Sequence, residues 1–349
     1  MHMADALISP AVGAGMWAVT ASIAAYSARN VTRHVEDSRV PLMGVLGAFV
    51  FAAQMINFSI PATGSSGHLG GGMLLAILLG PQAAFLVIAS ILVVQALFFA
   101  DGGLLALGCN IFNMGFFPAF IGYPWIYKTM AGDGSNATKR FWAILVAAVV
   151  SLQLGAFAVV LETTASGISE LPFGTFVLLM QPIHLAIGIV EGIATAAVVA
   201  IVWKARPEIV VGTSTADLRP TGNLKPVLVG LGVAAVLTAG VVSWFASSHP
   251  DGLEWSIAGV TGKEELEAPE TGVHGVFSHI QRWTAFMPDY NFKPEAEAAP
   301  AANKEKAEEA TWPAIEPGTS LAGIIGSIIT LMVALGIGYV LRIWSRKTT

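Results

Sequence analysis

PQAAFLVIASILVVQALFFA, residues 81–100, carries no acidic, basic or histidine side chain along its whole length. About 20 apolar residues are what an α-helix needs to cross the hydrocarbon core of a bilayer. The chain is 54% hydrophobic and only 12% charged, and so little charge cannot form a water-facing surface. Eight further apolar stretches fall at 7–28, 41–59, 69–80, 104–127, 141–161, 173–203, 226–246 and 321–342. The sequence therefore predicts an all-α integral membrane protein with about nine transmembrane helices.

The count of nine depends on the run 69–100. Gly80-Pro81 divides this run into two helices, because proline disfavours helix in the residue before it and suits the first turn after it. A single span here would give eight. Nine spans with an outer N-terminus place 13 of the 18 Lys and Arg residues on the inner side, where short loops of membrane proteins carry excess positive charge. We therefore predict nine spans, an N-terminus outside and a cytoplasmic C-terminus.

The charged segments indicate two membrane blocks. Residues 1–207 form a seven-helix block, and a basic cytoplasmic linker, 208–225, follows it. Residues 226–349 form a second block, in which two helices flank an outer segment at 247–320. Within that segment, 296–310 has no apolar side chain larger than alanine, so it is expected to be flexible or weakly helical.

Composition excludes several classes of function. The single Cys109 rules out a cysteine-rich metal site, so nitrogen or carboxylate groups must carry any metal chemistry. The net charge of −5, with few clustered basic residues, gives no surface for nucleic acid. No phosphate-binding G-x-x-x-x-G-K-[ST] loop is present, so ATP hydrolysis would have to come from partner subunits.

The first two residues, Met1-His2, form a potential chelate. A free α-amine, the backbone nitrogen of His2 and its imidazole offer three nitrogens in one plane and leave one equatorial position open. Such a square-planar site suits Ni(II) or Cu(II). No Lys or Arg precedes Leu7, so the stretch lacks the basic region of a signal peptide, and we expect Met1 to be the mature N-terminus.

A second candidate element is the glycine-rich stretch 61–72, PATGSSGHLGGG, which contains His68. In the nine-span topology it lies on the same outer side as Met1. Glycines on both sides of a histidine allow close backbone approach, as a loop needs when it folds into a helical bundle at membrane depth. The alternative is a flexible outer turn with an incidental histidine.

These features together resemble the CbiM/NikM substrate-binding components of energy-coupling-factor transporters for cobalt and nickel. The resemblance covers nearly the whole chain. The tail resembles the family's small auxiliary subunit of NikN type, and His249-Pro-Asp-Gly-Leu-Glu-Trp255 matches its PDGLE motif. The matching stretches in the first block are Met1-His2, Asp5, 7–10, 47–58, 65–72, 101–103, 108, 110–115 and 184–192.

The resemblance implies a site and partners. Its metal ligands would be the amine of Met1, the amide and imidazole nitrogens of His2, and the imidazole of His68. The chain would capture Ni2+ or Co2+ outside the inner membrane of a prokaryote, without any cofactor. It would dock on a transmembrane coupling subunit that two cytoplasmic ATPases drive. The fused tail favours nickel over cobalt, and because the ligand set is complete within residues 1–68, the tail is expected to affect transport more than metal binding.

Other polar residues have weaker claims. His184 and Glu191 share one face of the seventh span, and an ionisable group at membrane depth is a functional candidate. Hydrogen bonding between helices is the favoured reading of both. Asn57 and Ser66 are candidates to support the metal loop.

Three further histidines lie in the outer segment. His249 is a metal candidate only if its segment folds over the pocket, whereas His274 and His279 are expected to lie in solvent.

Two other classes of function stay open on the residues alone. An intramembrane enzyme using His184 and Glu191 would need a cluster of ligands or a nucleophile at depth, and no H-E-x-x-H motif is present. A self-sufficient ion-coupled carrier should transport alone, and the sequence has no evident inverted repeat to support one.

Overall fold

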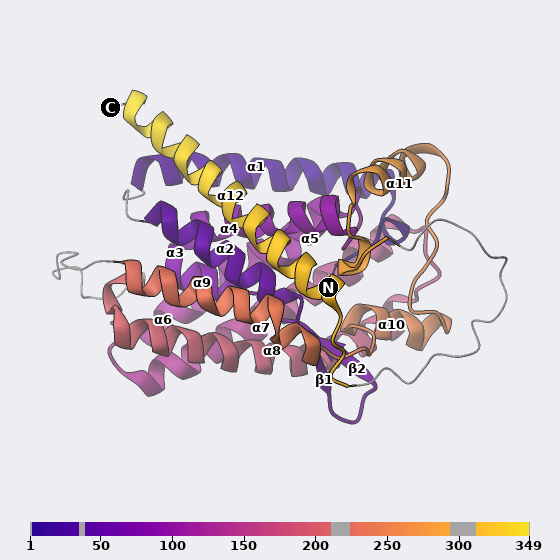
Figure 1. Cartoon of the computed structure of the whole chain (residues 1–349). Helices are drawn as coiled ribbons and strands as arrows, with labels where there is room; N and C mark the ends of the chain where they lie inside the picture. The colour runs from indigo at the N-terminus through magenta and orange to yellow at the C-terminus, as the bar shows by residue number, and fades with distance from the viewer. Residues whose placement is uncertain (1, 35–38, 211–223, 294–311, 349) are drawn as a thin grey trace.

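The computed structural model describes residues 2–34, 39–210, 224–293 and 312–348, and these are helical almost throughout (Figure 1). Long helices lie side by side, and β1, β2, α10 and α11 gather at one end. The predicted flexible stretch 296–310 and most of the linker 208–225 lie outside the described residues. The elements are η1 (Asp5–Leu7), α1 (Pro10–His34), α2 (Val40–Gln54), β1 (Phe58–Ile60), β2 (Ser65–Gly67), α3 (Gly72–Leu79), α4 (Pro81–Val94), η3 (Gln95–Phe99), α5 (Leu107–Ile111), η4 (Phe112–Tyr127), α6 (Lys128–Ala131), α7 (Ala137–Ser166), α8 (Phe173–Ala205), η5 (Pro207–Ile209), α9 (Lys225–Gly240), η7 (Val242–Phe245), α10 (Gly252–Thr261), α11 (Gly272–Thr284), η8 (Pro288–Tyr290) and α12 (Pro317–Thr348).

The described residues are mostly helical, as predicted for a membrane protein, and each of the nine predicted stretches contains a helix, although β1 and β2 form a short hairpin. Five helices among the described residues are long and apolar enough to cross a bilayer: Pro10–Thr32, Pro81–Phe99, Ala137–Ser166, Phe173–Ala205 and Pro317–Ser345. Two more, α2 and α9, are apolar but shorter. The eight residues of α3 extend only about 12 Å, so this helix is too short to cross alone.

The break predicted between two helices at Gly80-Pro81 is confirmed. Helix α3 ends at Leu79, Gly80 has φ of 85°, and Pro81 begins α4. A positive φ favours glycine, and proline at the first helical position lacks only an N–H that has no partner within the helix.

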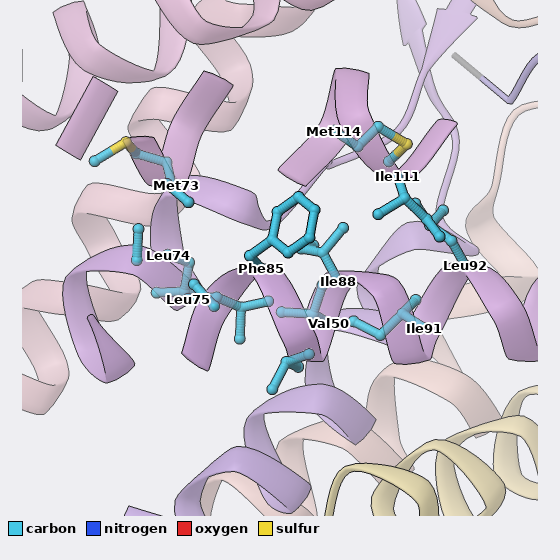
Figure 2. Packing of buried hydrophobic residues seen from close by; sticks show 14 of the residues in the cluster. Val50, Met73, Leu74, Leu75, Phe85, Ile88, Ile91, Leu92, Ile111 and Met114 are labelled. Carbon is cyan, nitrogen blue, oxygen red and sulfur yellow. The ribbon is translucent and has the colours of Figure 1, made fainter. Parts of the chain in front are cut away.

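Apolar packing around α4 forms the centre of the first block (Figure 2). Its side chains meet residues of α2, α3, α5 and η4, and an apolar surface on all sides is typical of a helix buried inside a membrane bundle. The labelled residues of this cluster are Val50, Met73, Leu74, Leu75, Phe85, Ile88, Ile91, Leu92, Ile111 and Met114.

The second block packs directly on the first. Helices α9 and α12 lie against α2, and Gly326 of α12 allows the closest approach. A Cβ atom built there would lie 2.1 Å from Cζ of Phe51, so any side chain at this position would force Phe51 to move. Small residues at such crossings are common between membrane helices.

The outward faces of the helices are apolar. Leu178 and Ile201 of α8 are 73% and 70% exposed, and Val229 of α9 is 62% exposed. Large apolar surfaces of this kind are stable in lipid rather than in water.

Candidate metal site

The segment that follows the N-terminus is fixed by one buried asparagine. Asn110 accepts a hydrogen bond from the Met3 N–H at 2.8 Å and donates one to the Met3 carbonyl at 3.1 Å. That carbonyl also accepts from the Gly103 N–H at 2.9 Å. Three hydrogen bonds at Met3 therefore hold the backbone next to His2 in one position.

Two glycines let this segment cross the turn after η3. Gly102 has φ of 79°, a conformation that favours glycine. A Cβ atom at Gly103 would lie 1.9 Å from Oδ1 of Asp5. The same Asp5 oxygen accepts a hydrogen bond from the Ala106 N–H at 3.0 Å, so the close approach is part of how the segment is held.

The glycine-rich loop starts as a hairpin. Strands β1 and β2 pair antiparallel, with Phe58 opposite Gly67, and His68 follows directly. Beyond it, the N–H groups of Gly70 and Gly71 donate to the two carboxylate oxygens of Glu191, each at 3.1 Å. Because Gly71 precedes the first residue of α3, the carboxylate of α8 lies where a helix N-terminus favours negative charge.

The two predicted histidine ligands meet between these elements. The rings of His2 and His68 are stacked, with centroids 5.0 Å apart and an angle of 25° between their planes. Each side chain is only 9% exposed. Burial lowers the pKa of His2 and lowers that of His68 well below its ordinary value. Neutral imidazoles result, and the lone pair of a neutral imidazole is what binds a metal ion.

A chain of amide groups sets which nitrogen of His2 carries the proton. Gln54 donates from Nε2 to the Gly70 carbonyl at 2.8 Å, so its Oε1 faces Gln95, whose Nε2 donates to it at 2.9 Å. Oε1 of Gln95 is then left facing Nε2 of His2 at 3.2 Å. This nitrogen must therefore donate, and the lone pair lies on Nδ1, the ring nitrogen nearest the backbone. Histidine ligands commonly donate their other N–H in this way.

A carboxylate faces the unprotonated nitrogen of each ring. Nδ1 of His2 lies 3.4 Å from Oδ1 of Asp101. Nδ1 of His68 donates to the Leu69 carbonyl at 3.2 Å, which leaves the lone pair on Nε2, and this atom lies 4.0 Å from Oδ2 of Asp251. A lone pair and a carboxylate repel each other unless a positive charge lies between them.

His2 and His68 line a cavity of about 550 Å³. Its field is negative, because no Lys or Arg of the described residues lines it. Acidic walls of this kind concentrate cations. The acidic lining residues are Asp5, Asp101, Asp251, Glu254, Glu264, Glu265 and Asp289.

Comparison with known proteins gives the family. Residues 2–209 match the family CbiM, described as the cobalt uptake substrate-specific transmembrane region. The chain belongs to the CbiM family. Residues 225–343 match the PDGLE domain. The predicted fusion of a CbiM-type block with a PDGLE-type block is therefore confirmed, and the protein is a transport component rather than an enzyme.

Relatives and solved structures agree with this assignment. A fused nickel transport protein, NikMN, of Rhodobacter capsulatus is 29% identical over 311 residues, which cover 83% of this chain and 88% of that protein. The cobalt transport protein CbiM of Sorangium cellulosum is 30% identical over 224 residues, 63% of this chain and 99% of that protein. The crystal structure of a transition metal transporter, 31% identical, covers 63% of this chain and 100% of its own, with a TM-score of 0.54.

The PDGLE domain folds over the loop of the CbiM region. The Ser66 hydroxyl donates to the His249 carbonyl at 2.8 Å, and the Ser66 N–H donates to the Pro250 carbonyl at 2.8 Å. The Ser247 N–H donates to the Asn57 carbonyl at 2.7 Å. Asn57 and Ser66, expected to support the metal loop, thus connect that loop to the PDGLE domain.

The other predicted candidates divide. Met1 lies outside the described residues. The side chain of His249 is exposed, and only its backbone faces the loop. His184 donates from Nδ1 to the Met180 carbonyl at 2.8 Å, whereas its buried Nε2 has no hydrogen-bond partner among the described residues. The carboxylate of Glu191 accepts hydrogen bonds from the backbone N–H groups of the glycine-rich loop.

The expectation for His274 is wrong. Its side chain is only 6% exposed, and Nε2 lies 2.9 Å from the Ile8 carbonyl. The reason is that α11 packs on the N-terminal segment and also on η3 and the turn after it, where Gln281 donates to the Ala96 and Gly102 carbonyls at 2.9 and 2.8 Å. His279 is exposed, as expected.

Sequence reasoning missed four residues of the site. Gln54 and Gln95 lie inside the apolar stretches 41–59 and 81–100, yet they orient His2. Asp101 and Asp251 were noted only within motifs. Their position directly before glycines, in DGG and in PDGLE, was the available signal.

Proposed function

We propose that the chain captures Ni(II) or Co(II) from the outer side of a prokaryotic inner membrane, as the substrate-binding component of an energy-coupling-factor importer. The observation that carries the proposal is the His2 and His68 pair, stacked with ring centroids 5.0 Å apart in an acidic cavity. Metal–nitrogen bonds of about 2.0–2.1 Å require the two imidazoles of one ion to lie this close.

Nitrogen ligation accounts for the choice of ion. In each imidazole, the nitrogen that bears the proton donates to a carbonyl oxygen, and the other nitrogen, which bears the lone pair, faces a carboxylate. The amine of Met1 and the amide nitrogen of His2 would complete a four-nitrogen plane, which suits Ni(II) and excludes the oxygen-preferring Mg(II) and Ca(II).

The membrane arrangement supports capture from outside. In the nine-span topology, with the N-terminus outside and the C-terminus cytoplasmic, α3 enters through the folded loop and need not cross alone. The boundaries 1–207, 208–225 and 226–349 then separate the metal-binding block, the cytoplasmic linker and the auxiliary block. Lipid would cover the apolar outer faces of α8 and α9.

Energy must come from partners, because the sequence contains no ATP-binding loop. We propose a transmembrane coupling subunit and two cytoplasmic ATPase subunits. Nickel uptake by cells that express the chain with and without these subunits tests this part. Uptake by the chain alone at the full rate would instead favour an ion-coupled carrier.

Cobalt is the second candidate ion. The matching family is described by cobalt uptake, whereas a relative that aligns with most of the chain is named for nickel. The fused PDGLE domain favours nickel here. Competition between nickel and cobalt for the purified chain decides the order of affinity.

The site is tested by nickel titration of the full chain in detergent, with a C-terminal tag that lacks histidine. His68→Ala should weaken binding by about 100-fold or more, equivalent to about 2.8 kcal/mol. His279→Ala is the matched control, because His279 is exposed, and it should bind as the wild type does. Wild-type affinity in His68→Ala would rule out this site.

A further inference from the structure

We propose that Asp251 of the PDGLE domain supplies a fixed negative charge to the metal site of the CbiM region, facing the ion-binding nitrogen of His68. This inference rests on the proposed function, since it gives a second block of the chain a part in the same site. The nitrogen ligands come from the CbiM region, and the carboxylate comes from the PDGLE domain.

The local structure of α10 holds the Asp251 carboxylate in one orientation. Oδ1 accepts hydrogen bonds from the N–H groups of Leu253 and Glu254, at 2.7 and 2.9 Å. Glu254 in turn accepts from the Asp251 N–H at 2.8 Å. This reciprocal capping box at the start of α10 engages Oδ1, and the second oxygen, Oδ2, is directed to His68.

The position of α10 over the loop is equally constrained. Besides the bonds at Ser66, the Trp255 indole N–H donates to the Thr63 carbonyl at 3.0 Å. A Cβ atom at Gly252 would lie 3.0 Å from Ile187 and 3.1 Å from the His184 ring. The glycine after Asp251 therefore lets the PDGLE motif lie flat on α8, which brings the carboxylate within 4.0 Å of His68.

The orientation of His68 shows which side of the ring the carboxylate occupies. Nδ1 is engaged with the Leu69 carbonyl, on the side away from the ion. Asp251 instead faces Nε2, the nitrogen that bears the lone pair. A carboxylate that only oriented the ring would accept from an N–H, whereas one that faces the lone pair is arranged for a cation.

Asp251 is placed as an acceptor in this buried position, because two backbone N–H groups donate to its carboxylate. A dication that enters this buried site loses its hydration shell, and a nearby fixed charge offsets part of that cost.

Three variants test the proposal in the full chain, with nickel titrated at about pH 8. Asp251→Asn keeps the helix cap, since asparagine caps as well as aspartate, but it removes the charge. Glu254→Gln keeps the capping box and removes a charge from the same cavity. Burial raises the pKa of Glu254 to about 7. This pKa still lies below the pH of the titration, so the Glu254 carboxyl is mostly ionised. Asp251→Ala removes both cap and charge.

Asp251→Asn should weaken nickel binding by about tenfold or more, or about 1.4 kcal/mol, and Glu254→Gln by less than about twofold. The nickel absorption spectrum should be unchanged in both, because the nitrogen ligands remain. If Asp251→Asn bound nickel with wild-type affinity and only Asp251→Ala bound it more weakly, the proposal would be overturned. Asp251 would then act only as the cap of α10. Equal losses in Asp251→Asn and Glu254→Gln would also overturn it. His68→Ala tests the proposed function separately in the same assay.

Discussion

Two segments far apart in the sequence approach His68, and they are built differently. The N-terminal segment is held through its backbone, by Asn110 and by the close approach to Gly103. The PDGLE segment is held by the Ser66 hydrogen bonds and by its own capping box. In the proposed site, the first presents nitrogen to the ion and the second presents a carboxylate. Ligand geometry and electrostatic field thus come from separate parts of the chain, so separate substitutions should change them.

The largest effect is expected from changing the N-terminal segment at its start. Inserting Ala between Met1 and His2 places another amide between the amine and the imidazole and changes the chelate rings. Nickel affinity should fall by about 100-fold or more, or about 2.8 kcal/mol. Acetylation of the amine should have a similar effect. Unchanged nickel titration of the correctly inserted variant would show that the first two residues take no part in binding.

A smaller effect is expected from Gly103→Ala. The added Cβ atom would lie 1.9 Å from Asp5 Oδ1 and 2.4 Å from the Asp5 nitrogen, so the N-terminal segment must shift away from its place. We expect a loss of nickel affinity of about 10- to 100-fold. Gly15→Ala is the control, because nothing lies within 4 Å of a Cβ atom there. Equal titration curves for the two variants would contradict this account of the segment.

Asn110→Ala should weaken nickel binding by about tenfold. It leaves the Met3 N–H without its side-chain acceptor inside the protein, at a cost of about 1–3 kcal/mol. Asn136→Ala is the control: Asn136 caps α7 by accepting from the Lys139 N–H at 3.0 Å, so its loss should lower thermal stability but leave nickel affinity unchanged. If both variants bind alike, Asn110 is a packing residue only.

The smallest effect is expected from weakening the contact between the glycine-rich loop and the PDGLE segment. Ser66→Ala removes the hydrogen bond to the His249 carbonyl, a net contribution of about 0.5–1.5 kcal/mol, and should reduce nickel affinity only a few-fold. Ser22→Ala, whose hydroxyl bonds within its own helix at the Ala18 carbonyl, should have no effect. If Ser66→Ala lowered nickel affinity as much as the Ala insertion does, the two segments would not contribute separately to ligand geometry and electrostatic field.

The helices were predictable because their signals are local. The length of each apolar stretch identified the helices, and Gly80-Pro81 identified the break. Both signals depend only on neighbouring residues in the sequence and not on contacts with distant ones. The length of α3 was less evident, because the apolar stretch 69–80 starts before the helix, which begins only after Gly71. Apolar composition gives the extent of a hydrophobic stretch but not how much of it is helical.

The site was predictable only in part. His2 and His68 stood out because a terminal chelate and a glycine-flanked histidine have distinct patterns. Asp251 did not, because its role depends on α10 folding across the loop, 183 residues away in sequence from His68. The expectation that the tail affects transport more than metal binding rested on a ligand set that is complete within residues 1–68. The position of Asp251 now implies that a tail-deleted chain should still bind nickel, but more weakly.

The amide chain from Gly70 to His2 has one further consequence. A glutamine side chain can be reversed in an ordinary protein interior, but here reversal of Gln54 would oppose its oxygen to the Gly70 carbonyl, and reversal of Gln95 alone would oppose its oxygen to that of Gln54. A main-chain oxygen, which cannot gain or lose a proton, therefore dictates the tautomer of an imidazole two side chains away. In the proposed site, Nδ1 of His2 is therefore kept free of a proton before any ion arrives, by a backbone group that no point substitution can replace.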